Sequence, residues 1–578
     1  MSQLEQLSFE LKEKVGQFHP DLFAARTISL ISELTAPWTA GSIQGLVSPM
    51  RQLLYLLNLN LTSPPRESYK NRFSEGDDRP MIEKLLQEID IIYKTDYGEF
   101  KPFDNEYLQN LGQDEALRRR LVGVGTYNAF FHLGPLQFEE QGIEKLREIF
   151  RNFNGDLKSK LGWDTEDLFN IYDTLDKLRQ SKQGEGYLKP GIPPLSQEQF
   201  MESVKASLAK GVPFDQAMRE ATPELSGIMA HRANPSRMHS FTRSEIPEIS
   251  DHLVDLILEN FTVERTINEK FLFFSQPNQL SKKPIYKTSK GEYIVIDHRM
   301  LLSAMTEFAK VECSKILKDP GRINKSRDKF LERKVENIFK TFYEGKEGVE
   351  IIPSYHLEGS ERDLLILDGS TALIIECKAG NVREPAFDPD KAYERIWSDF
   401  KETIDYAYDQ GYSVKEKFIE KNIFQITDNK HNCIREIDPH LYKQVFIIVV
   451  TFNKFGLVQN DLWLLLDIYE EDNEYPYAVC LDDLEMFLLA LTKMSKKPQD
   501  LYQFLRKRAE LHGKLNENDE GRIMGHFLQH KKFSKLGGAY RFPKNDDVIF
   551  DRLYSTGLGF ANERWMDLKL NPRLKKIY

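Results

Sequence analysis

Residues 350–380 read EIIPSYHLEGSERDLLILDGSTALIIECKAG, and this stretch decides the fold that we expect for the chain. It predicts three short strands, the last two of which face each other across a turn centred on Gly369 and Ser370. Glycine at the first central position is what a two-residue type II′ turn requires. Counting outward from this turn places Asp363 opposite Glu376.

The charged residues of these two strands are expected on one face of a sheet. Side chains alternate between the faces of a strand, so Lys378 should lie beside the two carboxylates while Cys377 points the other way. The runs LLIL and ALII are almost continuously apolar, as in central strands that are covered on both faces. Charges in such surroundings must be paired or bind a metal ion. We therefore expect Asp363 and Glu376 to share a hard cation such as Mg²⁺ through their oxygens.

The pattern D-x12-E-x-K on a β-hairpin, preceded by a helix that bears glutamate, resembles the PD-(D/E)xK nuclease superfamily. The resemblance covers roughly residues 325–480, about a quarter of the chain. Arg362 stands where the family often has proline. The resemblance implies a restriction-endonuclease-like fold, with Asp363, Glu376, Lys378 and Glu332 as catalytic residues.

The same resemblance implies a site for Mg²⁺ or Mn²⁺ held by Asp363, Glu376 and one glutamate from the preceding helix. In that helix, the expected buried stripe is Leu331, Val335, Ile338, Phe339 and Phe342. Glu332 lies at the edge of the stripe and is the favoured ligand, with Glu336, farther round the helix, as second choice. Gln410, on a long helix expected over residues 390–411 and ended by Gly411, resembles a position at which the family often offers a polar residue.

The activity that this resemblance implies is metal-dependent endonucleolytic hydrolysis of DNA. Large regions around a nuclease core resemble prokaryotic defence and restriction proteins, so an antiphage role, a homodimer or a partner protein of a defence system is expected by analogy. Two alternatives stay open: a catalytically silent nuclease fold used for binding or assembly, and a ribonuclease, or a nuclease gated by a partner. If the E-x-K strand were exposed, its charges would be an ordinary solvated pair.

The rest of the chain suggests an α+β protein with several domains and largely helical ends. We expect a helical N-terminal domain (1–181), a linker with a small α+β platform (182–318), the nuclease domain (319–485) and a helical C-terminal region (486–578). The nuclease domain should contain a mixed sheet flanked by helices. The first boundary rests on the Gly- and Pro-rich stretch at 181–196.

The amino-acid composition indicates which cellular compartment and which kinds of partner we expect. The net charge of −10 gives no overall basic signature for nucleic acid, although a local groove can still attract it. Four scattered cysteines without CxxC spacing argue against disulfides and zinc ribbons, and fit a reducing cytoplasm. The polar, acidic start does not resemble a signal peptide, and the longest apolar runs are too short to span a membrane.

One histidine pair stands near the C-terminus. His526 and His530 are four residues apart on an expected helix. They lack the glutamate of the HExxH metalloprotease motif, so we expect two histidines on a helix surface.

Overall fold

In the computed structural model, the expected hairpin is formed by β6 (Ser360–Asp368) and β7 (Thr371–Lys378). The antiparallel ladder pairs Leu364 with Ile375 and Asp368 with Thr371, which confirms the register read from the sequence. Gly369 has a φ of +55°, and Ser370 has no positive φ, as in a type II′ turn. The turn residues therefore fix which side chains meet across the hairpin.

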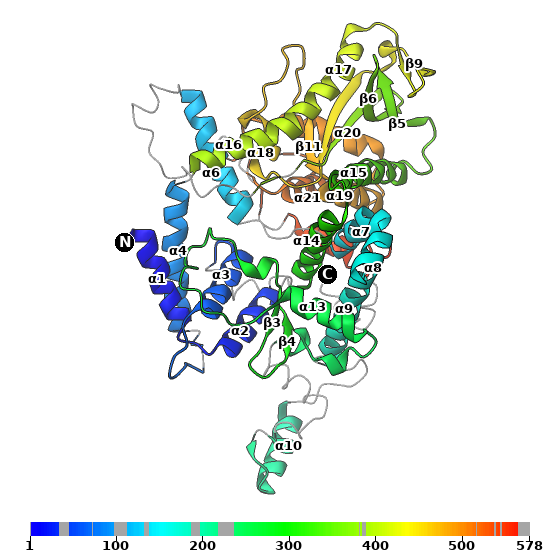
Figure 1. Ribbon diagram of the computed structural model, residues 1–578. Helices are drawn as coiled ribbons and strands as arrows, with labels where there is room; N and C mark the ends of the chain where they lie inside the picture. Colours follow the sequence, from blue (N-terminus) through cyan, green and yellow to red (C-terminus); the bar gives the residue numbers. More distant parts are fainter. Residues whose placement is uncertain are drawn as a thin grey trace. The chain divides into compact units, whose positions relative to one another are not determined.

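The structure describes most of the chain. These residues are 2–33, 46–71, 73–74, 76–96, 113–131, 138–185, 197–214, 216–217, 236–380, 382–383, 389–515, 517–533, 535–536, 539–540, 542–543 and 546–564. Within them the fold is α+β, with two mixed sheets and helices toward both ends of the chain (Figure 1). No helix among these residues is both long enough and apolar enough to cross a membrane.

The chain divides into two compact units. One contains the described parts of Met1–Ile92 and Gly142–Lys318, and the other those of Tyr93–Gln141 and Asp319–Asp567. The boundary expected at residue 319 coincides with a boundary between the units, whereas those expected after residues 181 and 485 fall inside a unit. Most of the expected linker lies outside the described residues, and its first five residues continue a helix.

The first unit is mainly helical. Its helices are α1 (Gln3–Val15), α2 (Pro20–Glu33), α3 (Pro49–Thr62), most of α4 (Asp78–Asp96) and α7 (Glu139–Phe150), α8 (Asn154–Leu161), α9 (Thr165–Glu185), α10 (Gln197–Ala209), α13 (Asp251–Phe261) and α14 (His298–Ile316). Its four-stranded sheet has the order β1 (Ser240–Phe241), β4 (Tyr293–Val295), β3 (Ile285–Lys287) and β2 (Thr262–Val263). The expected α+β platform corresponds to this sheet with α13 and α14.

The second unit is built around a seven-stranded mixed sheet. Its order is β11 (Tyr477–Cys480), β10 (Gln444–Thr451), β7, β6, β5 (Val349–Leu357), β8 (Phe424–Thr427) and β9 (Cys433–Ile437). Strands β11, β10 and β7 are parallel to one another, and every other neighbouring pair is antiparallel. The parallel strands therefore end at one edge, where Lys378 pairs with Thr451 and Thr451 with Cys480.

The helices of this unit pack on the sheet and on one another. They are α6 (Gln113–Phe131), α15 (Gly321–Phe342), α16 (Pro389–Phe400), α17 (Tyr406–Glu420), α18 (Leu457–Asn460), α19 (Leu481–Lys493), α20 (Pro498–Ala509), α21 (Glu520–His530) and α22 (Val548–Tyr554). Helix α17 packs on β7 and β10, and α15 packs on β7 and α19 (Figure 1). The stripe expected on α15 is buried as predicted.

The helix expected to end at Gly411 does not end there. A five-residue π-helical segment, Lys401–Asp405, joins α16 to α17, and α17 continues to Glu420. A Cβ at Gly411 would lie 2.7 Å from Cγ2 of Ile447 on β10. The glycine therefore permits close approach of helix and strand. From the sequence alone, the same glycine looks like the end of a helix.

Candidate functional site

The three charged residues of the hairpin come together where the β6–β7 ladder ends. Its last pair is Leu364 with Ile375, and Asp363 and Glu376 lie directly beyond it. Lys378 Nζ lies 3.9 Å from Asp363 Oδ2 and 3.7 Å from Glu376 Oε2. Asp363 Oδ2 also accepts a hydrogen bond of 2.6 Å from the backbone N–H of Cys377, which ties the end of one strand to the next.

Glu376 is the most unusual group in this cluster. Its side chain is 1% exposed, and among the described residues no hydrogen-bond donor reaches either carboxylate oxygen; only the protonated form can bond to Asp363, which also favours the neutral carboxyl group. Burial, followed by the negative charge of Asp363, raises the pKa of Glu376 to about 8, while Lys378 and Arg362 act in the opposite direction. A buried carboxyl group without a hydrogen bond is costly, so this arrangement is suited to a bound cation.

Lys378 is positioned from two sides. Its ammonium group faces the two carboxylates and lies 5.5 Å from the centre of the Tyr406 ring at the start of α17. A cation over an aromatic face gains electrostatic attraction from the ring. The side chain is 20% exposed, so Lys378 is held at the site and does not extend into bulk solvent.

Helix α15 contributes Glu332. Desolvation by surrounding protein, followed by the charges of Asp363, Glu361 and Asp328, raises the pKa of Glu332 to about 7, although the residue is exposed to solvent and screening weakens these effects. Glu336, in contrast, forms an ion pair of 2.5 Å with Lys340, one turn along the same helix. The structure thus couples Glu332 electrostatically to the hairpin, whereas Glu336 is paired with a lysine of its own helix.

Asp328 is a further acidic side chain, which the sequence suggests only as a helix cap and which the structure places inside α15. It lies one helical turn before Glu332, and burial raises its pKa while Arg327 and Lys378 oppose that shift. Residues four apart on a helix share a face. In the sequence, the D-x3-E spacing of Asp328 and Glu332 is the signal for this shared acidic face.

Gln410 is close to the hairpin without touching its charged group. Its backbone carbonyl accepts from Ser413 Oγ, and that hydroxyl accepts from Arg362 of β6. The Gln410 side-chain oxygen is buried without a hydrogen-bond partner. Among the described residues, no hydrogen bond or ion pair joins Gln410 to Asp363, Glu376 or Lys378.

Ser354, in the middle of β5, is a second feature that the sequence did not reveal. It has a φ of +49°, which is uncommon for a residue other than glycine. The ladder pairs on either side are Pro353 with Leu364 and Tyr355 with Arg362, so Ser354 lies across from Asp363. Backbone strain of this kind is found preferentially at functional sites.

Several buried polar atoms near the hairpin end lack a partner, which bears on whether a metal fits here. Besides both oxygens of Glu376, they are the Tyr355 hydroxyl, Arg362 Nε and the Gln410 side-chain oxygen. Asp363, Glu376 and Glu332 supply only oxygen donors, the set that Mg²⁺ and Mn²⁺ prefer. The donor chemistry of these residues therefore suits a hard divalent ion, but among the described residues their three ligand atoms do not lie close enough together to form a ready three-ligand group.

Comparison with known proteins identifies no relative that would assign this site. No family model matches the sequence, and neither the curated proteins nor the solved structures contain a match. The arrangement places carboxylate oxygens from two strand ends beside one ammonium group, and oxygen donors of this kind are those that a hard divalent cation prefers.

Proposed function

We propose that this protein is a metal-dependent nuclease that hydrolyses DNA phosphodiester bonds, with its second unit in a restriction-endonuclease-like fold. The observation that carries the proposal is the Glu376 carboxylate, buried without a hydrogen bond and flanked by Asp363 and Lys378. Elsewhere in a protein interior, such a group would be paired or replaced by an apolar side chain. A cation from solvent that binds the Glu376 carboxylate would explain why a charged residue is kept at this buried position.

Each residue then has a role. Asp363, Glu376 and Glu332 would hold Mg²⁺ or Mn²⁺, which supplies Lewis-acid stabilisation of charge on a phosphoryl group when bound. Lys378 would orient the attacking water or stabilise negative charge on the non-bridging oxygens. Tyr406 keeps that ammonium group in place. In the reaction, a bond forms between the water oxygen and phosphorus as the water gives up a proton to solvent, and the bond from phosphorus to the leaving ester oxygen breaks as that oxygen takes a proton from solvent.

The test uses the purified full chain with Mg²⁺ or Mn²⁺ and four substrates: duplex DNA, single-stranded DNA, supercoiled plasmid and RNA. We expect cleavage of DNA, and its loss in Asp363→Asn and Lys378→Ala without change in the circular dichroism spectrum. Lys430→Ala, an exposed lysine in the turn between β8 and β9, is the matched control.

Each contrary outcome has a definite meaning. Cleavage that persists in Asp363→Asn would show that the activity belongs to a contaminant or to another site. Binding of DNA without cleavage by the wild-type chain, with either metal, would favour the silent binding module. Cleavage of RNA alone would assign the same site to a ribonuclease.

A further inference from the structure

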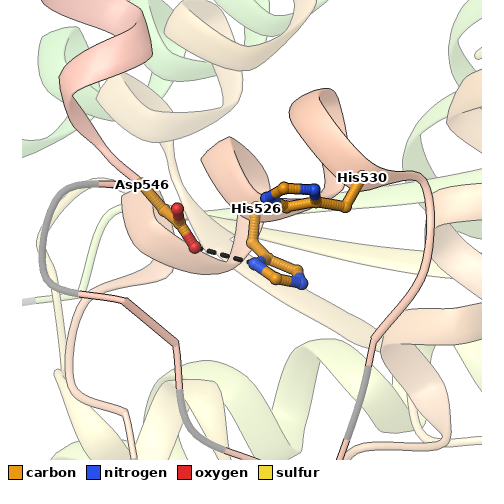
Figure 2. Close-up of side chains that lie close together, drawn as sticks. All are labelled: His526, His530 and Asp546. Atoms are coloured by element: carbon orange, nitrogen blue, oxygen red, sulfur yellow. Dashed lines mark hydrogen bonds and ion pairs between the residues drawn. The ribbon is translucent and has the colours of Figure 1, made fainter.

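A second group of metal-binding side chains lies in the second unit, on α21 and the segment that follows it. Figure 2 shows His526 and His530 on consecutive turns of α21, with Asp546 approaching from the chain beyond the helix. One ligand atom from each of the three residues lies within 4.8 Å of the others. His526 Nδ1 is 2.7 Å from Asp546 Oδ2. Asp546 is the residue that turns the histidine pair into a three-ligand group, and a helical spacing rule could not find it.

The backbone around Asp546 is fixed against the helix. A Cβ at Gly525 would lie 2.1 Å from the carbonyl oxygen of Asp546, so only glycine allows this approach. Gln529 Nε2 donates hydrogen bonds of 3.2 Å to the carbonyls of both Gly525 and Asp546. Asp546 is buried as a result, while His526 is half-buried and His530 is exposed.

Aromatic rings hold His526 in position. The ring of Phe542 lies 5.2 Å from that of His526 in an edge-on arrangement, and the ring of Phe533 lies 6.1 Å away and stacked. The His530 ring is 4.6 Å from His526. Apolar walls beside a polar cluster limit water access and restrict the imidazole to a small range of orientations.

From this geometry we propose that His526, His530 and Asp546 bind one transition-metal ion of the zinc class, at a site separate from the Asp363–Glu376 pair. Two imidazole nitrogens and one carboxylate oxygen suit Zn²⁺ far better than Mg²⁺, which selects oxygen. With Zn–N bonds of about 2.0–2.1 Å, tetrahedral ligands stand ~3.3 Å apart. The present 2.7 Å between His526 Nδ1 and Asp546 Oδ2 is shorter than this, so an ion bound to those two atoms would replace their hydrogen bond and move them apart. A fourth position is left for water or another ligand.

The ion would stabilise one particular segment. Between Lys531, where α21 has ended, and Asp546 lie the two short strands β12 (Lys535–Leu536) and β13 (Ala539–Tyr540). A metal bound to the last turn of α21 and to Asp546 joins the two ends of this segment. Closing a loop in this way reduces the conformational freedom of the open state. Zinc is therefore expected to act on the stability of this segment and not on phosphodiester chemistry.

The experiment measures zinc bound per chain after dialysis against a weak chelator, with Co²⁺ as a spectroscopic substitute. Wild-type protein should retain one zinc ion and give the strong visible absorption of tetrahedral cobalt. His530→Gln and Asp546→Asn should weaken zinc binding by at least about 100-fold, since even partners of ligands contribute 10- to 100-fold. Zinc should protect residues 531–546 from proteolysis in the wild type only.

Two controls separate this site from its surroundings. His431→Gln replaces an exposed histidine in a turn and should leave zinc binding unchanged. Asp363→Asn should retain zinc even though it removes the proposed nuclease centre, so the two proposals fail independently. Wild-type protein that retains no zinc overturns the inference. So does a zinc content that is unchanged in both His530→Gln and Asp546→Asn, or one that is lost in Asp363→Asn.

Discussion

The ammonium nitrogen of Lys378 lies 3.7 Å from the buried carboxylate of Glu376, which is near enough for attraction but too far for a hydrogen bond. The carboxylate consequently has a charge partner and no hydrogen-bond donor. Its pKa of about 8 shows that burial and Asp363 outweigh the attraction of Lys378. Without a bound cation, Glu376 therefore destabilises the fold at neutral pH.

The first prediction tests this destabilisation of the folded state by Glu376. Between pH 4.5 and about 8 the unfolded chain loses the Glu376 proton while the folded chain keeps it, so the stability of metal-free protein should fall as pH rises. Glu376→Gln removes this dependence. Across that window, wild-type protein should lose roughly 2–4 kcal/mol more unfolding free energy than Glu376→Gln. Urea denaturation in the presence of a chelator measures both; parallel pH profiles would contradict the prediction. Cleavage should be abolished in the variant.

The second prediction separates the two candidate glutamates of α15. Glu332→Gln should lower kcat/KM at least about tenfold, because Glu332 is coupled to Asp363. Glu336→Gln should leave cleavage unchanged, because Glu336 is engaged by Lys340. Steady-state kinetics with a fluorescent duplex would decide between them. The assignment is wrong if the Glu336 variant is the slower enzyme.

The third prediction concerns protons released on metal binding. Glu332 and Glu376 have pKa values of about 7 and about 8, so both hold protons near pH 6 that a cation must displace. Affinity for Mn²⁺ should rise between pH 6 and pH 8. Titration calorimetry in two buffers of different ionisation enthalpy counts the protons, and Glu332→Gln should release about one fewer. Metal affinity that is flat with pH would show that these carboxyl groups are not ligands.

The hairpin could be predicted because its determinants are local. A glycine in the turn, apolar runs on both strands and the two-residue period of side-chain direction fix which residues lie opposite each other. These are short-range rules, and the ladder from Leu364–Ile375 to Asp368–Thr371 confirms them. The convergence of Asp363, Glu376 and Lys378 follows from register alone, whereas their role in catalysis stays a prediction.

Features that depend on distant packing could not be predicted. Asp546 reaches His526 because its backbone passes close to Gly525, where only glycine leaves enough room. In the sequence, neither Asp546 nor Gly525 indicates a metal site. Helix α17 runs past Gly411 because its partner is Ile447, which lies 36 positions along the chain. Local glycine rules describe the backbone of one residue and carry no information about what packs against it.

The fourth prediction follows from that glycine. Gly411→Ala places a methyl group 2.7 Å from Ile447 and should destabilise the protein by about 1–3 kcal/mol through overpacking. Gly155→Ala, in α8 with nothing within 4 Å of the new Cβ, is the matched control and should stabilise by roughly 0.5–1 kcal/mol. Urea denaturation of the two variants gives the comparison. Equal stabilisation by both would mean that α17 and β10 are farther apart than the structure shows.

At Ser354, the side chains of strand β5 change the face of the sheet to which they point. Ile352, Tyr355 and Leu357 all belong to one buried cluster, although regular alternation would place Ile352 opposite to the other two. The φ of +49° at Ser354 makes this change, and it brings the Tyr355 hydroxyl into the electrostatic environment of Glu376. The positive φ of Ser354 thus determines which buried side chain of β5 lies near Glu376.

The fifth prediction tests this role with two changes at one exposed position. Ser354→Gly can adopt the positive φ freely and should be neutral or slightly stabilising, with cleavage retained. Ser354→Val should cost about 1–2 kcal/mol, because a β-branched residue resists the left-handed conformation, and should reduce cleavage as Tyr355 moves. Since the side chain at this position is exposed, lost packing cannot explain a difference between the variants. Equal stability and equal cleavage rates for both would show that β5 runs straight past Asp363 in solution.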